Sequence, residues 1–220
     1  MKKIILILSA VVTVSCSGQS NKKTNNTMKM DNQEYKGIDT EGYVSIPIEG
    51  GMEYRKGNIL YIFRDGALTT VEQLGWGGDD KYPESYAYIY EDTPNKIVYT
   101  DKSGDKSRSI THIEITLRKA IFYHKYNSKD GQHVKEYEMT TPLDIWIKLS
   151  QTFNWDKFSE LKSGASEQEW DGSDKTITVE TKSGTFSVTN YRGNELEDFF
   201  KVISDYHVYI YEKAVETKKD

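Results

Sequence analysis

Alternation of apolar and polar residues dominates the chain from about residue 43 to residue 140 and predicts antiparallel β-structure. Residues 43–48 alternate in this way. Pro47 within them favours an edge strand, because proline has no N–H to give to a neighbour. Further strands are predicted over residues 59–64, 68–74, 86–90, 96–100, 109–118, 120–126 and 133–139.

Two Asp-Gly pairs separate consecutive predicted strands. Asp65-Gly66 and Asp130-Gly131 each stand between two β-prone runs. Asp-Gly accepts the positive φ angles of a tight hairpin turn, so each pair predicts a β-hairpin.

The spacing of apolar residues becomes helical after residue 141. Residues 142–153 predict a helix, with Thr141 as its N-cap and Pro142 in the first turn. A second, short helix is predicted over residues 155–161, with Asn154 as its cap.

The C-terminal region predicts a hairpin, a helix and a last strand. The hairpin covers residues 176–180 and 185–189, and the helix covers residues 194–204. Residues 206–212 alternate and predict a strand with His207, Tyr209 and Tyr211 on one face. The whole pattern indicates an α+β fold, mainly antiparallel β-sheet, with two or three helices packed on one face and located in the C-terminal half.

The first 15 residues predict a secretory signal peptide. Lys2 and Lys3 precede an apolar run over residues 4–14, and small residues follow it. The run is shorter than the roughly 20 residues that a membrane-spanning helix needs.

Residues Thr13-Val14-Ser15-Cys16 resemble the lipobox of bacterial lipoproteins, with Thr13 in place of the usual leucine. The resemblance implies a diacylglycerol on Cys16, cleavage before it and acylation of the new amino terminus. Two or more acyl chains anchor a protein stably to a membrane. Cys16 is the only cysteine, so an intrachain disulfide is excluded.

The remaining chain divides by composition. Residues 16–40 are polar and are expected to form the lipidated cysteine and a flexible tether, residues 41–213 a single α+β domain, and residues 214–220 a disordered tail. Ser17, rather than the Asp of lipoproteins retained in the inner membrane, follows Cys16, and no acidic run of the kind that accompanies surface export comes after it. By resemblance to envelope lipoproteins, this implies an outer-membrane anchor facing the periplasm.

A second resemblance, to uncharacterised small envelope lipoproteins, covers about a quarter of the chain. It rests on Phe158, residues 161–164, residues 171–174, the following hairpin and Phe199-Phe200. It implies no particular activity.

The net charge argues against nucleic acid as a partner. Without Lys2 and Lys3, 27 basic residues stand against 34 acidic ones, a net charge of −7. An acidic domain repels phosphate backbones and suits a basic protein partner, or serves solubility alone.

Motifs for chemistry are absent from the sequence. The histidines His112, His124, His133 and His207 are far apart, and there is no HExxH, CxxC or GxSxG motif. Ser163 has no histidine nearby, and residues 171–174 suit a turn better than a calcium loop. We expect no enzymatic activity, no metal and no cofactor, although an enzyme whose site is assembled by the fold stays a third alternative.

The predicted binding surface combines a glycine-rich loop with a tyrosine stripe. Its residues are Trp76, Asp79, Asp80, Tyr86, Tyr88 and Tyr90.

The leading hypothesis is a lipid-anchored binding module, in its most concrete form an immunity-type inhibitor of a basic toxin or hydrolase in the envelope. The alternative is an envelope assembly factor, or a lipoprotein that binds glycan or cell wall through exposed tyrosines. Tyrosines covered by helices would remove that alternative.

Overall fold

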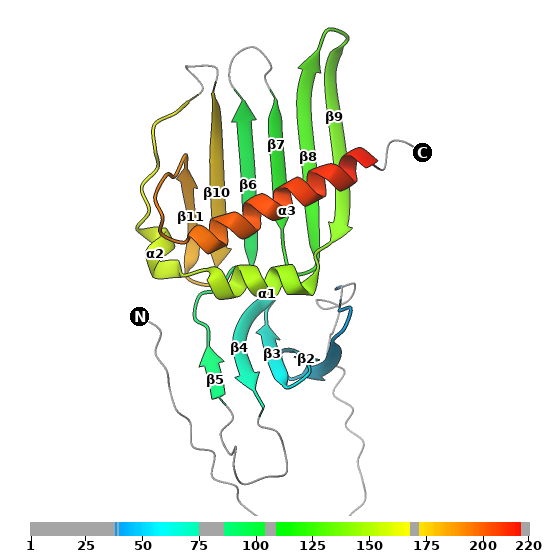
Figure 1. Cartoon of the computed structure of the whole chain (residues 1–220), viewed down its shortest axis with the longest axis vertical. Coiled ribbons are helices and arrows are strands. Elements are labelled where there is room, and N and C mark those ends of the chain that lie inside the picture. The colour runs from blue at the N-terminus through cyan, green and yellow to red at the C-terminus, as the bar shows by residue number, and fades with distance from the viewer. Residues whose placement is uncertain (1–37, 39, 75–85, 104–108, 168–171, 217–220) are drawn as a thin grey trace, which may run out of the picture.

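The computed structural model describes residues 38, 40–74, 86–103, 109–167 and 172–216. It contains two antiparallel β-sheets and three helices (Figure 1), so the predicted α+β class is confirmed. The signal peptide, Cys16 and nearly all of the tether lie outside the described residues, and their interpretation stays a prediction.

The first sheet has five strands in chain order. They are β1 (Val44–Ile48), β2 (Gly51–Lys56), β3 (Ile59–Arg64), β4 (Ala67–Gln73) and β5 (Tyr86–Ile89). β1 lies at the edge, as Pro47 predicted. β2 was not predicted, because it starts with a glycine and has only two inward apolar residues, Met52 and Tyr54. Gly51 is required there: a Cβ would lie 2.1 Å from the carbonyl oxygen of Phe63.

The second sheet has six strands in the order β11-β10-β6-β7-β8-β9. They are β6 (Lys96–Ser103), β7 (Ile110–Ile115), β8 (Lys119–Ser128), β9 (Gly131–Thr140), β10 (Ser173–Thr181) and β11 (Gly184–Thr189). The hairpin of β10 and β11 joins the sheet late in the chain, through antiparallel pairing of β10 with β6. Both Asp-Gly hairpins are confirmed, with positive φ at Asp65, Gly66 and Gly131.

Two of the helices follow β9 directly. α1 (Leu143–Thr152) begins after Pro142, which has no side-chain cap bond, so the prediction of Thr141 as N-cap was wrong. Thr141 is fully buried instead. α2 (Trp155–Ser159) is capped as predicted, since the Asn154 side chain accepts a 2.9 Å hydrogen bond from the N–H of Lys157.

The last helix, α3 (Glu197–Glu216), replaces the strand predicted over residues 206–212, and that prediction was wrong. Tyr206, Ile210 and Ala214 are buried at a spacing of four, which continues the apolar face that begins at Phe199. The local alternation of β-prone side chains was overridden by this packing. Residues 214–216 belong to the helix rather than to a tail.

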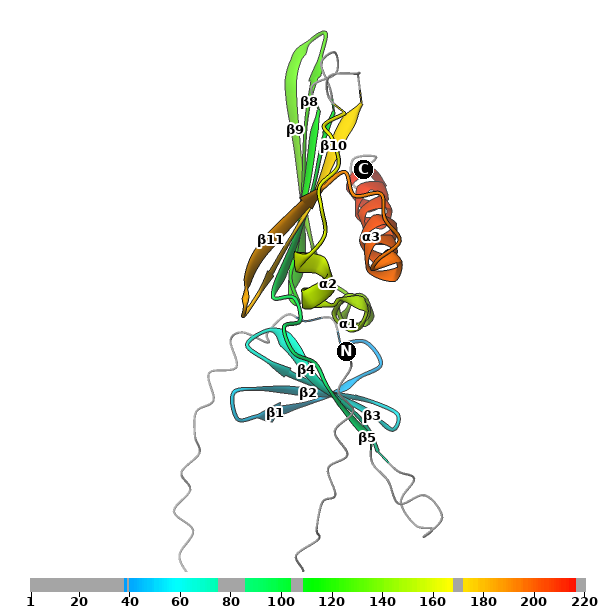
Figure 2. The ribbon, with the colours of Figure 1, turned by 90° about the vertical axis from the view of Figure 1, so that its left-hand side faces the viewer.

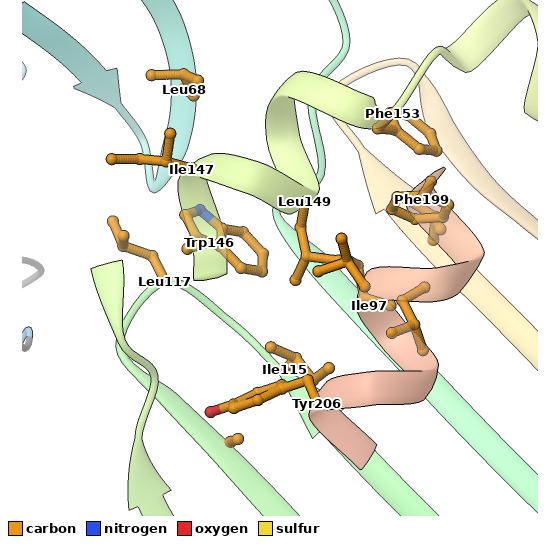
Figure 3. Packing of buried hydrophobic residues seen from close by; sticks show 14 of the residues in the cluster. Leu68, Ile97, Ile115, Leu117, Trp146, Ile147, Leu149, Phe153, Phe199 and Tyr206 are labelled. Carbon is orange, nitrogen blue, oxygen red and sulfur yellow. The ribbon is translucent and has the colours of Figure 1, made fainter. Parts of the chain in front are cut away.

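The hydrophobic core joins both sheets through α1. Side chains of the two sheets, α1 and α3 form one buried cluster (Figure 3). Trp146 of α1 is fully buried, and its indole N–H donates a 3.3 Å hydrogen bond to the carbonyl oxygen of Gly66 in the first sheet. On the second sheet, α2 and α3 lie on the same face (Figure 2).

Candidate functional site

The predicted binding surface is only partly described. Trp76, Asp79 and Asp80 lie outside the described residues. The side chain of Tyr86 is likewise outside the described part, whereas Tyr88 on β5 pairs with Val71 of β4 and shares its face of the sheet. Tyr88 is 50 % exposed.

Tyr90 is not part of an exposed tyrosine stripe. It is half-buried and packs against the hydrophobic core. Desolvation raises the pKa of its phenol, which therefore stays neutral. Part of the predicted stripe thus serves folding, and Tyr88 is the candidate whose side chain is clearly available to a partner.

A second acidic and aromatic surface lies on α3. Tyr206 and Ile210 face the sheet, whereas Val208 and Tyr209 between them are 50 % and 42 % exposed. The ring of Tyr209 stacks on that of Tyr206 with centroids 6.1 Å apart, which holds it in place. We define the α3 surface as Asp205, Val208, Tyr209, Tyr211, Glu212 and Glu216, all exposed.

Helix stability explains only part of the acidic charge of α3. The helix has five acidic residues against Lys201 and Lys213, which pair with Asp205 at 2.9 Å and Glu216 at 3.0 Å. Acids in the first turn favour a helix, but Glu216 lies in the last turn, where an acid is unfavourable, and Glu212 directly precedes that turn. Exposed apolar side chains with charged residues around them mark a candidate surface for a protein partner.

A second aromatic group stands on the helix-bearing face of β8 and β9. The rings of His124 and Tyr126 have centroids 5.2 Å apart, and those of Tyr126 and His133 stack at 5.1 Å. Tyr211 of α3 meets His124 edge-on at 6.4 Å. We call His124, Tyr126 and His133 the ring ladder. The hairpin of β8 and β9 extends beyond α3 (Figure 1).

Hydrogen bonds orient both imidazoles of the ring ladder. His124 Nδ1 lies 2.8 Å from Thr111 Oγ1, and His133 Nε2 lies 2.7 Å from Ser128 Oγ. Desolvation, and then the charge of Lys135, lower the pKa of His124, so this imidazole is neutral near pH 7. The ladder therefore offers half-exposed rings and polar edges, with the ammonium of Lys135 5.7 Å from the Tyr126 ring centroid.

A polar cluster of Tyr43, Lys56 and Asp144 connects the first sheet to α1. The Tyr43 hydroxyl donates a hydrogen bond to Asp144, and the Lys56 ammonium lies 3.1 Å from the same carboxylate. Burial, and then the bond to Asp144, raise the pKa of Tyr43, whereas that bond lowers the pKa of Asp144. The adjacent pocket of about 190 Å³ is smaller than the roughly 300 Å³ at which small-molecule sites begin. This cluster is a structural tie.

The remaining candidates for chemistry have structural partners. Ser163 Oγ accepts a 3.0 Å hydrogen bond from the N–H of Thr189. Asp174 accepts bonds from the Glu167 N–H and the Asn190 amide, the first of which is the main cause of its lowered pKa. His112 lies 3.2 Å from Thr100. Within the described ranges, no three His, Cys, Asp or Glu residues gather as a metal site would require.

No model of a known protein family matches the chain, and no curated protein matches it. In the part of the chain that the structure describes, no helix is both long and apolar enough to cross a membrane.

Proposed function

We propose that this protein is a lipid-anchored binding protein of the bacterial cell envelope that captures a basic protein partner through the α3 surface. The exposure of Val208 and Tyr209 among acidic residues carries the proposal. The anchor rests on the lipobox resemblance at Cys16. An immunity-type inhibitor, which neutralises a toxin or hydrolase in the envelope, is the most concrete form of this function.

The two kinds of residue on the α3 surface would act differently. Tyr209 and Val208 supply apolar area that a partner buries, and aromatic residues dominate the energy of such contacts. Glu212 and Asp205 attract a basic partner during encounter, and this attraction raises the association rate. High salt screens the charges and lowers the rate again. Capture that is fast and salt-sensitive is the expected behaviour.

Affinity capture of the full-length protein from envelope extract, washed at low and at high salt, tests this proposal. We expect one stoichiometric basic protein, released at high salt, whose capture falls at least about tenfold with Tyr209→Ala. Val134→Ala is the control, because Val134 is also an exposed apolar residue, at 49 % against 42 % for Tyr209, but lies on β9. Equal capture by the wild type and by Tyr209→Ala would exclude the α3 surface.

The ring ladder favours a second candidate function, binding of glycan or cell wall. Half-exposed rings of Tyr126 and His133 beside hydroxyl groups suit sugars, which contact both apolar faces and polar edges. Sedimentation with purified peptidoglycan tests it. Binding that survives high salt and is lost with Tyr126→Ala supports this function, and binding unaffected by that change contradicts it.

A further inference from the structure

The face of the first sheet that points away from the core is aliphatic. Tyr54, Phe63 and Val71 are buried toward α1, so the residues that alternate with them face outward. We define the aliphatic face as Val44, Ile46, Ile48, Leu60, Ile62 and Ile89.

The aliphatic face is not covered by any element that the structure describes (Figure 2). Val44 is 62 % exposed, Ile46 43 % and Ile89 49 %. Leu60 and Ile62 are half-buried, yet they are not among the side chains that pack on the core. An antiparallel sheet with one solvated face normally carries polar residues there, so these aliphatic side chains indicate a contact surface.

We propose that the aliphatic face rests on the lipid bilayer to which the chain is anchored, an inference that depends on the acylation of Cys16 proposed above. β1 is the first strand that the structure describes after the tether, and it carries three residues of the aliphatic face, Val44, Ile46 and Ile48. The polar composition of residues 16–40 predicts a flexible tether, and a flexible chain of the length between Cys16 and Val44 spans about 30 Å on average. The sheet is thereby held close to the membrane.

Because the lipid anchor already holds the protein at the membrane, a small contact surface is enough to orient the domain. A few exposed aliphatic side chains bind a bilayer weakly by themselves. A short flexible link, however, makes the contact intramolecular, with an effective concentration in the millimolar range. The acyl chains therefore supply the attachment, and the aliphatic face sets the orientation of the domain.

Charged residues on the same face limit how deeply the sheet can enter the bilayer. Glu53 lies between Ile46 and Ile62 in the pairing of β1, β2 and β3, and Arg55 and Glu72 flank Leu60. These side chains keep their charges in water, so the sheet lies at the headgroup layer rather than in the hydrocarbon. With charges of both signs, docking on a zwitterionic bilayer is insensitive to salt.

The unique cysteine makes a direct test possible. Once Cys16 is acylated, Ile89→Cys, or in a second variant Ile46→Cys, introduces the only free thiol, which takes an environment-sensitive fluorophore. The full-length acylated protein is placed in phosphatidylcholine vesicles that contain a lipid with a shallow quencher. Val134→Cys is the matched control, since Val134 is also 49 % exposed but lies on the second sheet.

We expect blue-shifted, quenched emission from positions 89 and 46, unchanged at high salt, and no quenching from position 134. Equal quenching at all positions, or none at 89 and 46, would overturn the proposal. A blue shift without quenching would also overturn it, because a second copy or a protein would then cover the face. Mass spectrometry of the amino terminus tests acylation separately. If Cys16 carries no lipid, the chain with Cys16→Ser and an N-terminal histidine tag on nickel-chelating vesicles gives the same comparison.

Discussion

At the scale of single residues, the core contains polar groups that its packing does not satisfy. Ser150 of α1 is fully buried, and its hydroxyl has no hydrogen-bond partner among the residues that the structure describes. The imidazole of His207 is largely buried beside Tyr99, with ring centroids 4.9 Å apart, and its Nε2 is also without a described partner. Each such group opposes folding, because it loses water and gains no bond.

Replacement of Ser150 by alanine is therefore expected to stabilise the protein. The change removes the unsatisfied hydroxyl and keeps the Cβ, so the free energy of unfolding should rise by about 1 kcal/mol. Urea denaturation measures this. Ser163→Ala is the control and should lower stability, because the Ser163 hydroxyl accepts a bond from Thr189. A loss of stability in Ser150→Ala would contradict the prediction.

The stability of the fold should also depend on pH through His207. Desolvation lowers the pKa of His207 below its usual value, and the nearby Asp101 opposes this only in part. The unfolded chain binds a proton at about pH 6.5. The stability that the neutral His207 imidazole contributes is therefore complete above pH 6.5. It is lost as the pH falls through the lower pKa that His207 has in the folded protein.

His207→Phe keeps the ring beside Tyr99 and removes the proton site. Denaturation at a series of pH values between 7 and 5 should show a smaller loss of stability in this variant than in the wild type. Part of the slope remains, since the pKa of His124 is also lowered. Identical slopes for the two proteins would mean that His207 is not held neutral by the fold.

At the scale of elements, α3 combines a buried face with charges that oppose its dipole. Glu212→Lys should raise the free energy of unfolding by about 0.3 kcal/mol, the low end of the helix-dipole effect, because position 212 directly precedes the last turn, where a cation is favourable. The same change should weaken capture of a basic partner. Thermal unfolding and affinity capture measure the two effects.

Glu197→Lys is the control on the same helix. Glu197 lies in the first turn, where an acid is favourable, so the change should lower stability. A Glu212→Lys variant that is less stable than the wild type would show that Glu212 has a structural role.

The edge strand β9 is protected by charge. Glu136 and Glu138 are exposed on its helix-free face, and Glu138 pairs with Lys119 at 2.8 Å. Free edges pair with other chains unless charges discourage them. The double variant Glu136→Val and Glu138→Val should show concentration-dependent association in analytical ultracentrifugation. The double variant Glu136→Ser and Glu138→Ser should show weaker association. A monomeric valine variant would show that β9 is protected otherwise.

At the scale of the whole molecule, α1 couples two sheets that share no strand. Trp146→Ala should cost about 3–5 kcal/mol, because it empties a fully buried site and removes the hydrogen bond to Gly66. Hydrogen exchange should show the first sheet losing protection before the second. Trp146→Phe keeps most of the apolar volume and should cost less. Uniform loss of protection in both sheets would mean that they unfold as one unit.

The interactions that define most of the first sheet, the late hairpin and the two short helices are mostly local, and the sequence by itself determined them; β2 is the exception. Asp-Gly turns, period-two alternation and the Asn154 cap depend on neighbours within a few residues. The edge position of Pro47 followed from its missing N–H. The acidic charge and the lipobox resemblance are also properties of the sequence alone.

Only the tertiary structure decided which part of the chain forms the candidate site. Residues 206–212 alternate like a strand, and they become helical because Tyr206, Ile210 and Ala214 together complete a face buried against the sheet. That choice turns Val208, Tyr209 and Glu212 outward, whereas a strand would have placed Tyr209 beside His207. The pairing of β10 with β6 is equally non-local. Burial of apolar area is shared between distant segments, so no local pattern contains it.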